Sequence, residues 1–215
     1  MKDTRPLLSL DEALARLVAG AVPRRITQTE TISSFDALGR VLAADVISAL
    51  DVPPADNTSM DGYALRAADV PAAGTVLAVS QRIPAGVVGT ALQPGTAARI
   101  FTGGQVPSGA DAVVMQEQCA ALPVDLTGGG LGEVRVDTVP TRGQWIRRAG
   151  EDVRRGATVL AAGTRLTPQA LGMAASVGAA TLAVWRRPRV ALFSTGDELA
   201  MPGEPLKPGA IYNSN

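Results

Sequence analysis

The 215-residue sequence has no histidine and a single cysteine, Cys119. These absences exclude a disulfide within the chain, a zinc site built from Cys and His, a Ser-His-Asp triad and a Cys-His dyad. Acid–base or metal chemistry must therefore use carboxylates, hydroxyls, lysine, arginine or backbone groups. Carboxylate and hydroxyl oxygens suit Mg²⁺ far better than zinc. We expect Cys119 to be a small, buried or half-buried apolar residue.

Aromatic residues and net charge are also scarce. Aromatics make up 3% of the chain, and 20 Lys and Arg balance 20 Asp and Glu. Nucleic-acid-binding proteins need a basic surface or stacking platforms, so this composition argues against nucleic acid as a partner. No apolar run reaches the roughly 18 residues that span a bilayer, and the N-terminus lacks the apolar segment of a signal peptide. We therefore expect no membrane partner and a cytoplasmic location.

Hydrophobic residues make up 46% of the chain, with 23 Gly and 15 Pro. This composition predicts one large or two modest domains, rich in turns and short strands. Ser9 and Glu12 form a capping box, and apolar residues recur at helical spacing up to Val18, which predicts a helix that stops near Gly20. Alternating β-branched residues predict a strand over 26–34.

The middle of the chain has an all-β pattern, with short apolar runs separated by Gly/Pro turns. Such regular spacing predicts a compact β-barrel or sandwich, and the glycine triplet at 128–130 predicts a hairpin tip. Thr167 and Pro168 are typical of a helix N-terminus, and Gly178 of its end. The strands expected from these patterns cover 41–47, 76–83, 96–103, 111–117, 132–139, 157–166 and 180–184.

The last part of the sequence follows a Pro-containing boundary, RRPR, at 186–189. The apolar run at 190–195 predicts a buried strand of a parallel α/β sheet. It ends in STGDE at 194–198, which places hydroxyls, bare backbone and two acids where α/β sheets bind ligands. A lone apolar strand would be an exposed edge. We therefore expect this sequence to be the front part of a longer protein, with an incomplete α/β domain.

Two loops and one charged stretch carry candidate functional groups. PPADNTSMDGYA at 53–64 fits a rigid turn that presents Asp61, although it also fits an ordinary surface loop. Thr102 stands before Gly103 and Gly104, which allow close approach of a ligand to the backbone or simply form a turn. The arginine-rich stretch 142–155 is typical of a solvated face, with an anion site as the alternative.

The motifs DVPPADNTSMDGYA, IFTGGQVPSGADAVVMQE, RRAGEDV, AGTRLTPQALGMAASVG and VALFSTGDEL occur in this order. Together they resemble the MoeA-type molybdopterin molybdenumtransferases, whose eukaryotic relatives include gephyrin, over essentially all of 9–215. The resemblance implies an α+β, multidomain fold in an elongated homodimer. Its parts would be a helix and connection packing on the α/β domain (9–28), a small linking α/β domain (29–47 and 157–187), a β-rich protruding domain (48–156) and the start of the molybdopterin-binding α/β domain (188–215).

The resemblance implies a role in molybdenum cofactor biosynthesis. The family inserts molybdate into adenylylated molybdopterin with Mg²⁺ and releases AMP. Asp61, Thr102, Asp152 and Glu198 match family positions implicated in the site. The resemblance assigns Asp152 and Glu198, with neighbouring Asp197, to Mg²⁺ or its waters. It assigns Asp61 to a hydrogen-bonding or metal-shell role. The positions that would contact the oxyanion or pterin are Thr102, Gly103, Ser194, Thr195 and Gly196.

The resemblance also implies sites shared between the two subunits, with Asp61 and Thr102 completing the partner's site, and it allows molybdopterin adenylyltransferase as a protein partner. The family's later glycine-rich turn, further acids and PGNP-type loop are absent from these 215 residues. We therefore expect the chain alone to be inactive. The alternative is a non-catalytic dimerisation and protein-binding module of the gephyrin-like type. The gene sequence downstream of Asn215 would separate these readings.

Overall fold

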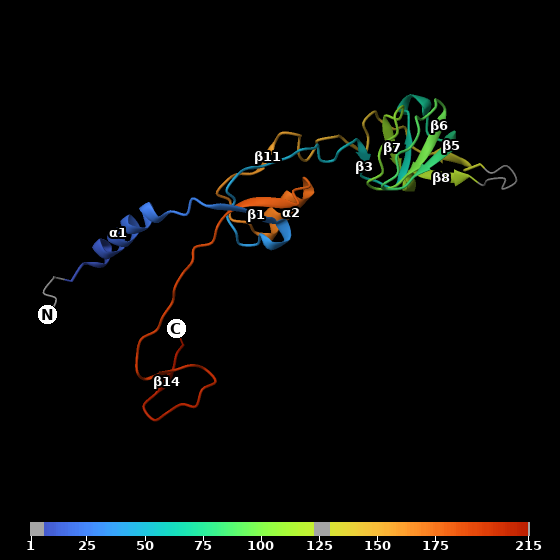
Figure 1. The fold of residues 1–215 in the computed structure, drawn as a ribbon. Coiled ribbons are helices and arrows are strands. Elements are labelled where there is room, and N and C mark those ends of the chain that lie inside the picture. The colour runs from blue at the N-terminus through green and yellow to red at the C-terminus, as the bar shows by residue number, and fades with distance from the viewer. Residues whose placement is uncertain (1–6, 123–129, 215) are drawn as a thin grey trace. The chain divides into compact units, whose positions relative to one another are not determined.

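The structure is a computed structural model that describes residues 7–122 and 130–214 (Figure 1). The chain divides into two compact units, one formed by 1–30 with 185–215 and the other by 31–184. Each unit is described by itself. The described part is mostly β with few helices, as expected. The glycine triplet at 128–130, expected as a hairpin tip, lies largely outside the described residues.

The first unit contains helix α1 (Leu10–Ala21) and a short parallel pair, β13 (Leu199–Ala200) with β14 (Ile211–Tyr212). The predicted capping box is confirmed, because the Ser9 Oγ accepts from the Glu12 backbone N at 3.3 Å and Glu12 Oε2 accepts from the Ser9 N at 3.0 Å. None of the α1 side chains is buried within the described chain, and its large apolar residues are exposed.

The buried strand expected over 190–195 is not formed. These residues have no strand assignment, and Leu192 and Phe193 are 84% and 82% exposed. An extended segment becomes a strand only when a neighbour pairs with its backbone, and no segment of the described residues pairs with this one. Among those residues there is also no helix with the length and apolarity needed to cross a membrane.

The second unit contains a small core where α2 packs with two short antiparallel strand pairs, β1 with β12 and β2 with β11. Thr167 caps α2 as expected, since its Oγ1 accepts from the Ala170 N at 3.2 Å. The elements are β1 (Thr29–Ser33), β2 (Val46–Ile47), β11 (Thr158–Leu160), α2 (Pro168–Ser176) and β12 (Thr181–Trp185). The buried residues are Ala37, Leu42, Val46, Leu166, Ala170, Ala174, Val177, Leu182 and Val184.

A six-stranded curled sheet forms the rest of this unit, in the order β7-β4-β6-β5-β9-β8 (Figure 1). All neighbours are antiparallel except β5 and β6. Its strands are β4 (Gly62–Leu65), β5 (Thr75–Ile83), β6 (Thr96–Ile100), β7 (Ala112–Met115), β8 (Cys119–Leu122) and β9 (Glu133–Val136). Sequence patterns indicated four of them and missed β4 and β8. Cys119 is half-buried, as expected.

Both faces of this sheet are buried, in keeping with the period-2 alternation of its strands. Tyr63 and Leu65 pack on the concave face with the alternate residues of the neighbouring strands, whereas Ala64 packs on the opposite face. We call the first cluster the concave core and the second the outer core. The outer core also takes Leu92 and Val106 from connecting segments, so loops cover that face.

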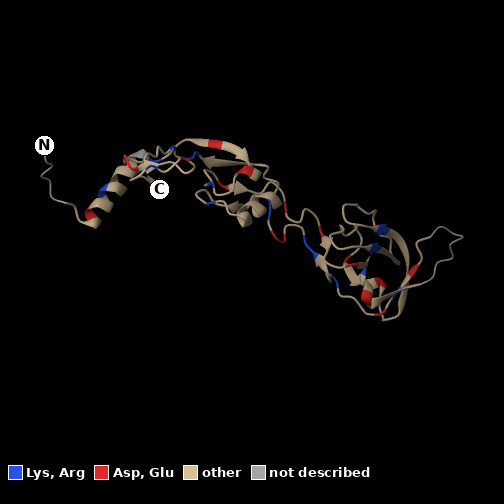
Figure 2. Cartoon of the chain, turned by 90° about the horizontal axis from the view of Figure 1, so that it is seen from below, with Lys and Arg blue, Asp and Glu red and all other residues tan. Residues whose placement is uncertain are grey.

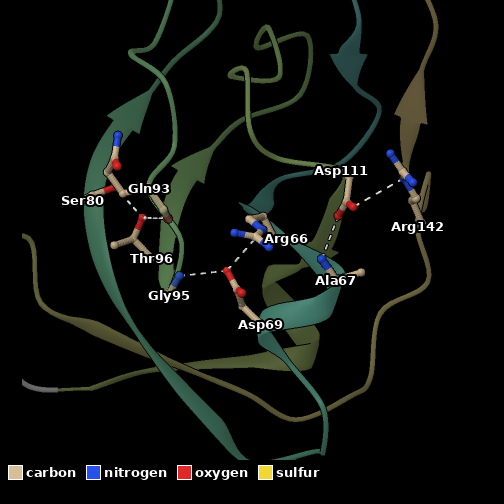
Figure 3. Close-up of polar contacts among 9 residues, drawn as sticks. All are labelled: Arg66, Ala67, Asp69, Ser80, Gln93, Gly95, Thr96, Asp111 and Arg142. Atoms are coloured by element: carbon tan, nitrogen blue, oxygen red, sulfur yellow. Dashed lines mark hydrogen bonds and ion pairs between the residues drawn. The ribbon is translucent and has the colours of Figure 1, made fainter.

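Two carboxylates brace the turns of the sheet (Figure 3). The Asp69 side chain accepts a hydrogen bond from the Gly95 N at 2.8 Å, and the Asp111 side chain accepts one from the Ala67 N at 2.7 Å. Arg142 lies 3.5 Å from Asp111. Because Asp69 and Asp111 accept backbone hydrogen bonds within turns, they serve to stabilise the fold.

Two antiparallel segments, 48–58 and 146–157, join the small core to the sheet, and we call them the connector. The Val52 N donates to the Val153 O at 2.7 Å, and the short strands β3 (Asn57–Thr58) and β10 (Ile146–Arg147) pair beside the sheet. Figure 2 shows acidic and basic residues interspersed there. The connector contains Asp152, one of the expected site residues.

Candidate functional site

The loop from 57 to 61 presents Asp61 at the start of β4. The buried Thr58 Oγ1 donates to the Met60 O at 2.8 Å and accepts from the Met60 N at 3.1 Å, which closes a tight turn. The next residue, Gly62, cannot carry a side chain, because a Cβ there would lie 1.9 Å from the Val114 O. The turn and the close strand contact together fix where the Asp61 carboxylate stands.

Asp61 is paired with Thr102. The Asp61 Oδ1 accepts hydrogen bonds from both the Thr102 N and the Thr102 Oγ1, each at 2.7 Å. The hydrogen bond from the Thr102 backbone N, then the one from its hydroxyl, and then the nearby Arg99 guanidinium hold the pKa of Asp61 below its usual value. The carboxylate is therefore ionised at neutral pH, and its Oδ2 takes no part in these two hydrogen bonds, so this oxygen can accept from another donor or face a cation.

The backbone after Thr102 turns sharply because it contains two glycines. Gly103 has a positive φ of 79°, which favours glycine. A Cβ on Gly104 would lie 2.8 Å from the Phe101 O and 2.9 Å from a side-chain carbon of Ile100. Both glycines are therefore required by the backbone of the turn itself, without reference to a ligand. The turn directs the Thr102 hydroxyl and amide toward Asp61.

Arg99 supports this pair from near the C-terminal end of β6. Its Nη1 donates to the Gly62 O at 2.9 Å and its Nη2 to the Gln116 Oε1 at 2.6 Å. The Gln116 N in turn donates to the backbone O of Asp61 at 3.0 Å. No sequence motif singled out Arg99, because its contacts come from strand register.

Asp152 lies on the connector and is ion-paired there. Arg147 contacts Asp152 at 2.6 Å and Glu151 at 3.1 Å. Arg148 contacts Asp56 at 2.5 Å. Partial burial alone would raise the pKa of Asp56. The hydrogen bond from the Ala149 N and the pairing with Arg148 outweigh this effect and hold the pKa of Asp56 below its usual value. Arg147 and Arg148, two of the arginines expected near the site, thus pair with acids of their own region.

The remaining expected residues lie in the other unit, on the turn at 194–198. The Leu199 N donates to the Gly196 O at 3.1 Å, and the Asn213 Nδ2 donates to the Ser194 Oγ at 3.1 Å. Asp197 and Glu198 are exposed. The structure thus pairs Asp61 with Thr102, places Asp152 with Arg147, and keeps 194–198 within a separate unit.

The carboxylates can be compared with what Mg²⁺ requires. No group of three or more Cys, Asp or Glu side chains converges among the described residues. Mg²⁺ keeps several waters and commonly uses one or two carboxylates together with substrate phosphates. In both Asp61 and Asp152, the contacts described above involve Oδ1 and not Oδ2. Each of these two carboxylates therefore offers an oxygen of the kind that Mg²⁺ binds.

The sequence matches the family model of the MoeA N-terminal region (domain I and II) over residues 8–178. The chain belongs to the MoeA family. It is 47% identical over 190 residues to a molybdopterin molybdenumtransferase 2 of Mycobacterium tuberculosis, covering 86% of this chain and 45% of the relative. It is 38% identical over 209 residues to the molybdopterin molybdenumtransferase of Haemophilus influenzae, covering 97% and 50%.

Solved MoeA structures have the same fold. A MoeA protein of molybdopterin biosynthesis from Pyrococcus horikoshii superimposes with a TM-score of 0.74 and 36% identity, over 87% of this chain and 49% of that chain. A second structure gives a TM-score of 0.73 and 33% identity, over 97% and 52%. The chain therefore spans about half the length of the MoeA relatives that it matches.

Proposed function

We propose that this chain contributes the Asp61–Thr102 pair to a site that inserts molybdenum into adenylylated molybdopterin during molybdenum cofactor biosynthesis, with release of AMP. The observation that carries the proposal is the doubly hydrogen-bonded Asp61 carboxylate at 2.7 Å from both the Thr102 N and Oγ1. The relatives named above, which are molybdopterin molybdenumtransferases, supply the reaction class.

The chain's own groups would act by orientation and charge. Thr102 holds the Asp61 carboxylate in one position, so that its other oxygen accepts a hydrogen bond from the substrate or faces a cation. Such preorganisation avoids reorientation of the site during the reaction. Asp152, Asp197 and Glu198 would hold Mg²⁺ or its waters. The cation would offset the negative charge of the phosphates and molybdate.

The substrate would meet groups from two copies of the chain. Asp61 and Thr102 belong to the unit 31–184, whereas Ser194, Thr195 and Gly196 belong to the other. We propose that two copies of the chain form a homodimer in which Asp61 and Thr102 complete the site of the partner. Sharing of this kind would make turnover depend on protein concentration.

The proposal is tested with a chimera in which this chain replaces the matching part of the Mycobacterium tuberculosis relative. We expect the chimera to release AMP from adenylylated molybdopterin with molybdate and Mg²⁺. Asp61→Asn should lower this rate by on the order of 100-fold, because it removes the charge at a preorganised position. Asp137→Asn is the matched control, since Asp137 is an exposed acid of the same unit that pairs with Arg135.

Equal AMP release by the Asp61→Asn and Asp137→Asn chimeras would refute the role of Asp61. The 215-residue chain alone should show no AMP release at any Mg²⁺ concentration. Robust release by the chain alone would contradict the expectation that the rest of the site comes from other segments. A chimera that folds and dimerises but releases no AMP would favour the alternative of a non-catalytic assembly module.

A further inference from the structure

Two arginines lie side by side in the curled sheet. β5 and β6 are its one parallel pair within the described residues, and their register places Arg82 directly opposite Arg99. Tyr63 lies opposite Arg99 on the other side, in β4. Like charges that face each other across neighbouring strands destabilise a sheet. The repulsion between Arg82 and Arg99 must therefore be offset by another interaction.

An irregularity in β5 brings Arg82 to this position. The register shifts between Val79 and Gln81, so that Ser80 is an extra residue opposite β6. Val79 packs against the concave core, and strict alternation would then place Gln81 on that face and Arg82 on the other. The extra residue reverses the alternation, which puts Ile83 in the outer core and Arg82 level with Arg99. Bulges often re-aim a side chain near a functional site.

Neutral groups hold both guanidinium groups in place. The Arg82 guanidinium lies 4.6 Å from the centre of the Phe101 ring, and that of Arg99 lies 4.5 Å from the same ring. The two charges are therefore no more than about 9 Å apart. Arg99 also lies 5.2 Å from the ring of Tyr63. Among the described residues, no carboxylate lies within ion-pair distance of either arginine.

A cavity of about 230 Å³ opens beside these two arginines. This volume is below the roughly 300 Å³ at which sites for drug-sized ligands begin, so the cavity suits a small ligand. Two of its charged groups are positive and one is negative, which favours an anion. Its lining is Tyr63, Val79, Arg82, Arg99, Ala121, Leu122, Leu131 and Glu133.

We propose that this cavity is a binding site for a small tetrahedral oxyanion, with Arg82 and Arg99 as its cationic groups. Stacking on Phe101 orders the Arg82 side chain before the anion arrives, which lowers the entropy cost of binding. The anion would also remove the repulsion between the two arginines. Phosphate and molybdate share the required charge and shape. Asp61 and Thr102 do not line the cavity, and Arg99, which lies near Asp61, is the residue that the two sites share.

The proposal is tested by nuclear magnetic resonance titration of the 215-residue chain with sodium phosphate and, separately, sodium molybdate at constant ionic strength. We expect saturable shifts of the Arg82 and Arg99 side-chain N–H signals. Arg82→Gln should weaken binding at least tenfold, and this exposed residue can change without loss of the fold. Glu133→Gln should strengthen binding severalfold, because it removes the negative group of the cavity. Arg135→Gln, which removes an arginine that pairs with Asp137, should leave the affinity unchanged.

Saturation by either anion supports the site, and the tighter of the two is the anion that the cavity prefers. Absence of saturable shifts with both anions would overturn the proposal. Equal affinity of the unmodified chain, Arg82→Gln and Arg135→Gln would also overturn it, because binding would then reflect general surface charge. These outcomes need no turnover, so they are independent of whether the chimera releases AMP.

Discussion

Replacing Gly62 by alanine tests how closely β4 and β7 approach next to Asp61. The added Cβ would lie 1.9 Å from the Val114 O, and real Cβ contacts do not fall below 3.0 Å. The two strands must therefore part by about 1.1 Å. A typical ladder bond of about 2.9 Å would lengthen to about 4 Å and be lost.

The free-energy cost follows from the register of β4 on β7, where Gly62 pairs with Met115 and Tyr63 with Val114. Loss of two or three ladder bonds at about 1 kcal/mol each lowers the free energy of unfolding by about 2–3 kcal/mol. Disturbed packing of Tyr63 and Val114 brings the total to about 3–4 kcal/mol. In a chain of this size, the melting temperature should fall by on the order of 10 °C.

Calorimetry and hydrogen exchange of the β4 and β7 amides measure this change. Gly172→Ala is the control, because Gly172 lies within α2 and a Cβ there meets nothing within 4 Å. That control should raise the free energy of unfolding by about 0.5–1 kcal/mol. If Gly62→Ala melts within 2 °C of the unmodified chain, a limit set from the roughly 2–4 °C expected per kcal/mol, the reasoning from strand approach is wrong.

Three further predictions concern ionisable groups. Thr102→Val should raise the pKa of Asp61 part of the way to its usual value, since the backbone hydrogen bond remains, and carboxyl carbon shifts in NMR would report it. Asp56 has a lowered pKa, so it contributes stability above its unfolded pKa, and this contribution is lost as the pH falls through the folded pKa. Asp56→Asn should therefore flatten the acid limb of the denaturation curve, and identical acid limbs would contradict the pairing with Arg148. Burial, and then the charge of Asp137, raise the pKa of the Cys119 thiol to about 11. At pH 8 only about one thiol in a thousand is ionised, and labelling by a disulfide reagent should be correspondingly slow compared with a free thiol.

Local signals in the sequence predicted local structure well. The capping box at Ser9 and the cap at Thr167 require only residues within one helical turn, and both form as expected. Asp61 and Thr102 could be chosen by residue type and by family resemblance. Their contact could not be predicted from spacing, because it joins positions 41 residues apart in sequence.

The sequence patterns failed where the answer depends on strand register or on a neighbouring segment. The roles of Arg82 and Arg99 follow from a one-residue shift at Ser80, which no hydrophobic pattern reveals. The run at 190–195 reads like a buried strand, yet without a pairing segment among the described residues it remains irregular and exposed. The apolar composition of a segment indicates that it favours burial. Whether it is buried as a strand depends on whether another segment of the fold pairs with it.

The chain leaves the small core and returns to it at almost one point, where the connector begins. The Ser48 N donates to the Ala157 O at 2.9 Å, and the Gly156 N donates to the Ser48 O at 2.8 Å. The segment from Ser48 to Gly156 is therefore an insertion whose two ends are in contact, as in a domain that has been inserted into another domain. This segment could be deleted and its two ends joined by a short turn. The remaining chain would then form the small core around α2 as one continuous polypeptide.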